Sequence, residues 1–162
     1  FMPAILKGIM EKMEDGPLSG CRVRDIRVSV YDGSMHSVDS NDAAFKTAAL
    51  MAFKDGFMNA KPQLMEPIYE VEINVPSEFM GDVMSDLSTR RGQIQGMDAE
   101  GSLQHIHEHV PLDELDNYST QLKSMTQGSA TFQQKFSHYA QVPPQIQEKI
   151  VQEHSQELQE AS

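Results

Sequence analysis

The sequence has little cysteine, little basic charge and no long apolar run. Its single cysteine, Cys21, excludes a disulfide framework and a cysteine-rich zinc site. No apolar stretch approaches the roughly 18 residues that a membrane span needs. The N-terminal segment is broken by Pro3, Lys7 and Glu11, which is unlike a secretory signal. We therefore expect a cytoplasmic protein without a membrane partner.

Acidic residues outnumber basic ones, and the excess lies in the second half. The chain has 24 Asp and Glu against 13 Lys and Arg, a formal net charge of −11. Up to Glu66 there are 8 basic and 9 acidic residues, whereas 5 basic and 15 acidic residues follow. Phosphate contacts supply most of the affinity of nucleic-acid-binding proteins. The composition thus argues against tight, non-specific binding of RNA or DNA, and any local contact is expected from the first half.

Two helices and a strand are expected in the first half of the chain. An apolar residue at every fourth position predicts a helix over residues 2–15. Apolar and polar residues alternate over 21–31, which predicts a strand. A polar loop over 32–39 follows, and Ser40 is expected to cap a second helix with an apolar stripe over 45–60.

The second half has the order strand, helix, strand, strand, helix, strand, which is typical of a ferredoxin-like domain. The strands are expected at 68–75, 92–99, 103–110 and 130–139, and the helices at 77–90, 112–126 and, finally, 143–159. The prediction is an α+β chain with domains at residues 1–66 and 67–142 and a C-terminal helix and tail at 143–162.

Common catalytic motifs do not occur. The sequence has no G-x-x-x-x-G-K-[ST], G-x-S-x-G, H-E-x-x-H or G-x-G-x-x-G, and we predict no catalytic residue. His105, His107 and His109 alternate, so on a strand they face one side. Neighbouring imidazoles suit zinc or nickel, but the outer pair lies about 13 Å apart. A polar strand face, with Ile106 and Val110 in the core, is the favoured alternative to a metal site.

Charged residues elsewhere allow two interpretations. Arg90 and Arg91 come where a helix passes into a strand, and they suit the last helical carbonyls and a phosphate equally well. Glu66, Glu70 and Glu72 allow paired carboxylates, but a solvated acidic face is favoured because no companion motif accompanies them.

Many blocks of the sequence resemble bacterial elongation factor G. Residues 31–40, YDGSMHSVDS, resemble its YDGSYHDVDS loop. Further blocks follow in the same order: Ala44–Lys46, Met51–Lys54, Ala60–Pro62, Leu64–Ile68, Met80–Val83, Arg90–Gly92, Gly96–Met97, Val110–Leu112 and Ser124–Gly128. The resemblance implies the latter part of domain IV, a partial left-handed β-α-β domain, followed by the ferredoxin-like domain V.

The resemblance also implies a fragment of a longer parent. The family's GTPase domain and two middle domains would precede Phe1, so GTP and Mg²⁺ are expected as cofactors of the parent only, and this part is not expected to be an enzyme. The ribosome is the implied partner. A tip loop is expected to meet rRNA, tRNA and mRNA in the decoding region, and it comprises Gly33, Ser34, Met35, His36, Ser37, Val38, Asp39 and Ser40. Contacts at the large-subunit stalk base are expected from Arg90, Arg91, Gln127 and Gly128.

Departures from the family pattern keep other functions open. Met35 and Ser37 replace the tip tyrosine and an aspartate, and Gln127-Gly128-Ser129 replaces a basic turn. These changes indicate a divergent paralogue, so recycling or ribosome protection is the alternative to translocation. A metal- or ligand-binding module built on His105, His107 and His109 is the alternative of another class. A homodimer through the exposed face of the truncated domain IV is also expected.

Overall fold

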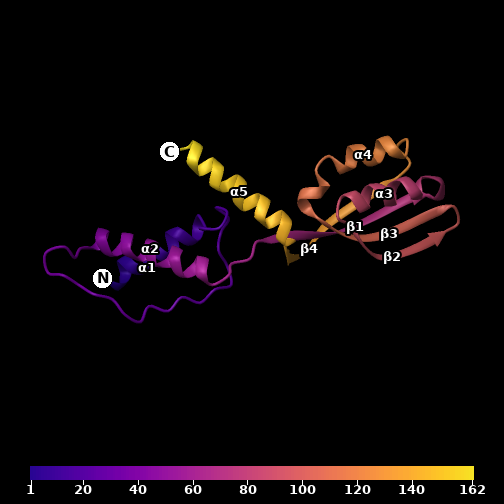
Figure 1. The fold of residues 1–162 in the computed structure, drawn as a ribbon. Helices are drawn as coiled ribbons and strands as arrows, with labels where there is room; N and C mark the ends of the chain where they lie inside the picture. The colour runs from indigo at the N-terminus through magenta and orange to yellow at the C-terminus, as the bar shows by residue number, and fades with distance from the viewer. The chain divides into compact units, whose positions relative to one another are not determined.

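The structure is a computed structural model that describes residues 1–162, and it divides into two compact units. One unit comprises Phe1–Leu64 and Val142–Ser162, and the other comprises Met65–Gln141 (Figure 1). The sequence placed the boundaries after residues 66 and 142, and the structure has them after 64 and 141. None of the helices combines the length and apolar character that crossing a membrane requires.

The first unit is built on two packed helices, α1 (Met2–Glu14) and α2 (Asp42–Asn59). Ile9, Ala49 and Phe53 are buried between them. The helices approach closely at Gly8, where an added Cβ would lie 2.6 Å from the carbonyl oxygen of Lys46. Both predicted helices are confirmed, although the second begins after a different cap.

Asn41, and not Ser40, caps α2. The Asn41 Oδ1 accepts a hydrogen bond from the Ala44 amide at 2.8 Å, as an N-cap side chain does. The Ser40 hydroxyl instead accepts the amide of His36 at 2.8 Å. The prediction of Ser40 as the cap is wrong because its side chain serves the preceding loop.

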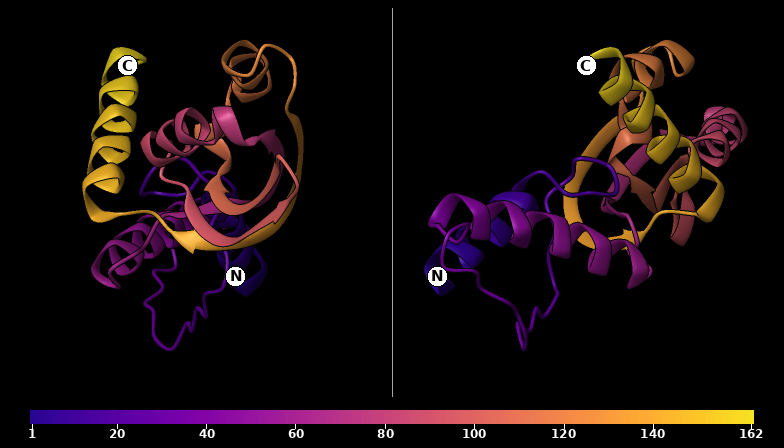
Figure 2. Two further views of the ribbon diagram at one scale, coloured as in Figure 1. Left: turned by 90° about the vertical axis from the view of Figure 1, so that its right-hand side faces the viewer. Right: turned by 60° about the vertical axis from the view of Figure 1, so that its left-hand side comes forward.

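Residues 21–31 do not form the predicted strand. The connection between α1 and α2 contains no helix or strand over this stretch, and Asp25 has a left-handed backbone with φ of 58°. Figure 2 shows the connection as a long loop. Val23 alone is buried there, with its amide bonded to the Met13 carbonyl at 2.8 Å. Ile26, Val28 and Val30 are 41–44% exposed. An alternating pattern indicates which side chains tend to be buried. A strand also needs a neighbouring backbone with which to form hydrogen bonds.

The absence of a strand at residues 21–31 removes the strand edge through which a homodimer was expected. Without a strand at residues 21–31, the first unit offers no strand edge for pairing, and the apolar surface of this stretch consists of the half-exposed Ile26, Val28 and Val30 and the exposed Tyr31. The homodimer stays a prediction, and light scattering at high protein concentration tests it.

The second unit is a four-stranded antiparallel sheet with two helices on one face. The strands are β1 (Met65–Pro76), β2 (Gln93–Glu100), β3 (Leu103–Pro111) and β4 (Thr131–Gln141), in the order β2-β3-β1-β4. The helices α3 (Met80–Thr89) and α4 (Tyr118–Met125) lie on the same face of the sheet (Figure 1). The predicted ferredoxin-like arrangement, and with it the α+β class, is confirmed.

Both helices of this unit begin with a 3-10 turn. Ser77–Phe79 precedes α3, and Leu112–Leu115 precedes α4. The predicted helix over 112–126 is therefore interrupted, because Asp116 is extended and Asn117 has a left-handed backbone with φ of 55°. The last helix, α5 (Pro144–Glu160), belongs to the first unit, where the Leu64 amide donates to Gln147 Oε1 at 2.9 Å.

Alternation along the two central strands divides the sheet into an apolar and a polar face. The face toward α3 and α4 contributes to a core formed by Val71, Ile73, Val75, Val83, Leu87, Ile106, Val110, Leu115, Tyr118 and Leu122. The opposite face carries Glu70, Glu72 and Asn74 from β1, opposite three histidines of β3. The predicted burial of Ile106 and Val110 is thus confirmed.

Candidate nucleic-acid interface

The predicted tip loop is a closed turn on the surface of the first unit. Gly33–Asp39 are exposed and Ser40 is half-buried. Two hydrogen bonds close the turn at His36 and Ser40: the His36 amide donates to Ser40 Oγ at 2.8 Å, and the Ser40 amide donates to the His36 carbonyl at 3.1 Å. The loop ends directly at the N-cap of α2, so a helix fixes one side of it.

Apolar side chains in the loop, and Tyr31 just before it, are largely exposed to solvent. Tyr31 is 95% exposed, Val38 is 90% exposed and Met35 is 65% exposed. Such side chains have no packing role within this unit, and an aromatic face of this kind is a platform on which bases stack. His36 is exposed between Met35 and Ser37 and offers an imidazole that donates and accepts hydrogen bonds.

Two basic residues precede the loop, and neither was among the contact residues predicted from the sequence. Arg24 and Arg27 are exposed and form no ion pair, whereas Arg22 pairs with Glu14 at 3.2 Å. They lie on the irregular segment that leads to the loop. The run RVRDIR at residues 22–27 is the sequence signal for them. The prediction of a strand rested on the apolar positions of this run and left its arginines out.

Arg90 is occupied by contacts within the second unit. Its Nε bonds Asp86 at 2.9 Å, one Nη bonds the Glu114 carbonyl at 2.5 Å, and the other bonds Gln121 at 2.6 Å. The guanidinium also lies 4.9 Å from the centre of the Tyr118 ring. The Arg90 side chain does not bind the last carbonyls of α3, which was one of the two roles considered for it, but binds a carboxylate of α3 and oxygens of Glu114 and Gln121. A contact with phosphate stays a prediction.

Arg91 forms a two-pronged pair with Glu66. The two Nη atoms meet the two carboxylate oxygens at 2.8 and 2.9 Å, and Nε reaches Glu114 at 3.2 Å. The bond to Glu66 raises the pKa of the Arg91 guanidinium above its usual value. Both arginines thus hold β1, α3 and the Leu112–Leu115 turn together, and their expected contact with RNA stays a prediction.

Gln127 and Gly128 form the turn after α4. Both have left-handed backbones, with φ of 54° and 78°, and the Gly128 amide returns to the Lys123 carbonyl at 2.9 Å. The turn is exposed. The structure does not bring this turn into contact with Arg90 or Arg91, so the four predicted contact residues form no single cluster among their side chains.

The three histidines of β3 face one side, as predicted, but they have different partners. His105 contacts Asn74 and lies 3.3 Å from Glu100, His107 lies 3.5 Å from Glu72, and the ring of His109 packs edge-on against His138. No two of the three face each other as a pair of ligands.

Comparison with known proteins assigns both units to one family. A family model described as elongation factor G, domain IV, matches residues 1–61, and one described as elongation factor G C-terminus matches residues 63–150. The chain belongs to the elongation factor G family. Elongation factor G of Aquifex pyrophilus is 49% identical over 153 residues, which are 94% of this chain and 22% of that protein.

A solved structure agrees with the assignment to the elongation factor G family. A crystal structure of a protein from Thermus thermophilus matches with a TM-score of 0.76 and 46% identity, covering 96% of this chain and 24% of that one. The chain thus spans less than a quarter of the length of these relatives. The tip loop lies within the match to domain IV, and Arg90, Arg91, Gln127 and Gly128 lie within the match to the C-terminus.

Proposed function

We propose that this chain is the ribosome-interacting C-terminal portion of an elongation factor G-like protein that acts in translation elongation, during the movement of tRNA and mRNA. The observation that carries the proposal is the exposed turn at Gly33–Ser40 within residues that match domain IV. This turn holds two exposed apolar side chains and an imidazole, and the exposed aromatic ring of Tyr31 lies just before it, so the surface is suited to contact RNA.

The chemistry of the first unit supports contact with RNA by stacking and local charge. Tyr31 and His36 provide flat rings, and base–aromatic stacking contributes about 1–3 kcal/mol per base. Arg24 and Arg27 are free to meet phosphate oxygens. The second unit has 12 acidic and 4 basic residues over 65–141, so its average charge repels a nucleic-acid backbone.

The proposed mechanism is mechanical. The turn at Gly33–Ser40 enters the decoding region and prevents tRNA from returning, while no bond is made or broken by these residues. In this proposal GTP and Mg²⁺ are cofactors of the longer parent, and no residue of this chain is their ligand.

The proposal is tested in the longer protein that carries these residues. We expect His36→Ala and Tyr31→Ala to slow single-round translocation at least about tenfold, because each removes a stacking surface at the tip. Met35→Ala has a matched control in Met51→Ala, since Met35 and Met51 are 65% and 69% exposed but Met51 lies on α2. Equal rates for wild type and all loop variants would remove the loop from the mechanism.

A role in ribosome recycling or ribosome protection is the second candidate. The observation that favours it is the tip itself, where an exposed Met35 and Ser37 stand in place of the family's tyrosine and aspartate. A subunit-splitting assay and a drug-rescue assay with the parent separate these activities from translocation. Replacement of Met35 by Tyr should then raise translocation if the altered tip is what redirects function.

A further inference from the structure

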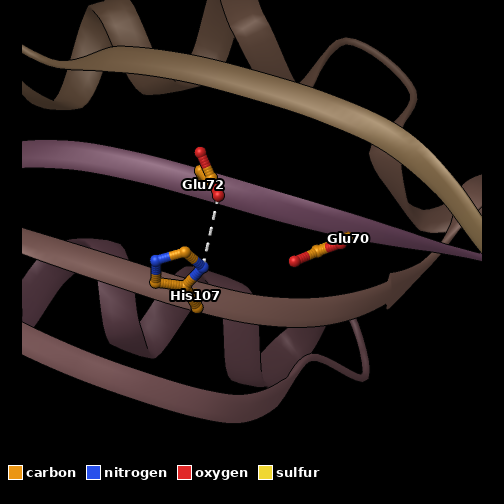
Figure 3. A group of neighbouring side chains, drawn as sticks. All are labelled: Glu70, Glu72 and His107. Carbon is orange, nitrogen blue, oxygen red and sulfur yellow. Dashed lines mark ion pairs between the residues drawn. The ribbon is translucent and has the colours of Figure 1, made fainter.

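The polar face of the sheet in the second unit brings together two carboxylates and an imidazole. Glu70 and Glu72 lie two residues apart on β1 and therefore face the same side. His107 on β3 is the direct cross-strand partner of Glu72. Figure 3 shows both carboxylates reaching toward the His107 ring from the neighbouring strand.

The three side chains are close enough to share one ion. One oxygen of each carboxylate and one ring nitrogen of His107 lie within 4.8 Å of one another, and His107 Nδ1 is 3.5 Å from Glu72 Oε1. Ligands around a tetrahedral ion with bonds of about 2.1 Å lie about 3.4 Å apart. Small rotations about the side-chain bonds of Glu70 close the remaining gap, because that side chain is long and half-exposed.

We propose that Glu70, Glu72 and His107 form a binding site for a divalent first-row transition-metal ion such as Zn²⁺. Imidazole together with carboxylate suits zinc and its neighbours, whereas Mg²⁺ and Ca²⁺ prefer oxygen ligands alone. Three protein ligands leave a further coordination position open to water.

The fold supports this arrangement. β1 and β3 are the two central strands, so each backbone is hydrogen-bonded on both sides and holds its side chains in fixed register. Two carboxylates on one strand face repel each other, and a cation between them removes that repulsion. The acidic excess of residues 65–141 further raises the local concentration of cations.

The same contacts explain why His107, and not the other two histidines of β3, is the ligand. His105 is engaged by Asn74 and Glu100, and the ring of His109 packs against His138. The pair of neighbouring histidines, which was the less favoured interpretation of the sequence, is therefore replaced by one histidine and two carboxylates. Lys135 on β4 lies 3.5 Å from Glu70 Oε2 and competes with the ion, but its side chain is 74% exposed and free to move away.

Isothermal titration of the untagged 162-residue chain with ZnCl₂ tests the site. We expect one equivalent to bind with a dissociation constant below about 100 µM. Glu70→Gln, Glu72→Gln and His107→Ala should each weaken binding at least about tenfold, because each removes a ligand. Lys135→Gln should tighten binding, since it removes the competing cation.

Matched controls separate this site from non-specific binding to acidic or histidine-bearing surfaces. Glu78→Gln removes an exposed carboxylate outside the cluster, and His105→Ala removes a histidine of the same strand face; both should leave the affinity unchanged. Cobalt(II) bound to the wild type should show visible absorption bands that His107→Ala abolishes. No binding at about 200 µM Zn²⁺, or unchanged binding by His107→Ala in a chain with the wild-type circular dichroism spectrum, would overturn the proposal.

Discussion

Glu108 is a carboxyl group inside the core of the second unit, and its replacement by Gln should make the protein more stable at neutral and alkaline pH. The side chain lies on β3 between Ile106 and Val110 and is 2% exposed. Its Oε2 has no hydrogen-bond partner. The same oxygen rests against Gly92, where an added Cβ would lie 2.3 Å from it. Burial without a partner raises the pKa of Glu108 to about 7, from 4.5.

The size and sign of the effect follow from this pKa difference between the folded and unfolded chain. A raised pKa means that the folded chain favours the protonated carboxyl. The contribution of Glu108 to the free energy of unfolding is therefore complete below about pH 4.5 and is lost as the pH rises through about 7. A difference of about 2.5 units corresponds to about 3 kcal/mol between pH 4 and pH 8. Glutamine has nearly the same shape and never ionises, so it avoids that loss.

Urea unfolding of the wild type and Glu108→Gln from pH 4 to pH 8 measures the effect. The two free energies of unfolding should agree within about 1 kcal/mol at pH 4 and differ by about 3 kcal/mol at pH 8, with Gln the more stable. The difference between the curves isolates Glu108 from all other titrating groups. Glu78→Gln, an exposed carboxyl, is the control and should give a flat difference. A Glu108→Gln difference that does not change with pH would refute the reasoning.

Three further pairs of substitutions test packing and pairing through denaturant midpoints. Tyr118→Phe removes a buried hydroxyl that has no partner and should change stability by less than about 1 kcal/mol, whereas Tyr118→Ala also removes the ring and should cost about 3–5 kcal/mol. Arg91→Ala leaves the buried Glu66 carboxylate unpaired and should cost about 2–3 kcal/mol; Arg91→Lys keeps the charge and should cost less. Gly8→Ala drives a Cβ against the backbone of α2 and should cost about 1–3 kcal/mol, while Gly56→Ala, which meets nothing within 4 Å, should be neutral or stabilising.

The second unit could be predicted from the sequence because its side-chain pattern and its short turns indicate the strands and their buried faces. The alternation of apolar and polar residues over 68–75 and 103–110 indicates which side of each strand is buried. The short turn Glu100-Gly101-Ser102 connects β2 and β3 as a hairpin. The interruption of the helix at Asn117 was not predicted, although Asn is one of the non-glycine residues that most often adopt a left-handed backbone.

The first unit shows where pattern reasoning fails. Its two helices were predictable, because a helix satisfies its own backbone hydrogen bonds. The absence of a strand at 21–31 was not predictable, since an alternating stretch forms a strand only where a second backbone lies beside it. The exposure of Tyr31 and Val38 also could not be read from the sequence, whereas the position of the tip loop followed from the resemblance to a known family.

The candidate metal ligand and the buried carboxyl both follow from the alternation along β3. Residues 105, 107 and 109 face the polar side, so residues 106, 108 and 110 must face the core. The same rule that predicted burial of Ile106 and Val110 from the sequence also requires burial of Glu108. A shift of one residue in register would expose Glu108, but it would also bury three histidines and expose two aliphatic side chains. The observed register therefore places the Glu108 carboxyl in the core. The same register places His107 opposite Glu72.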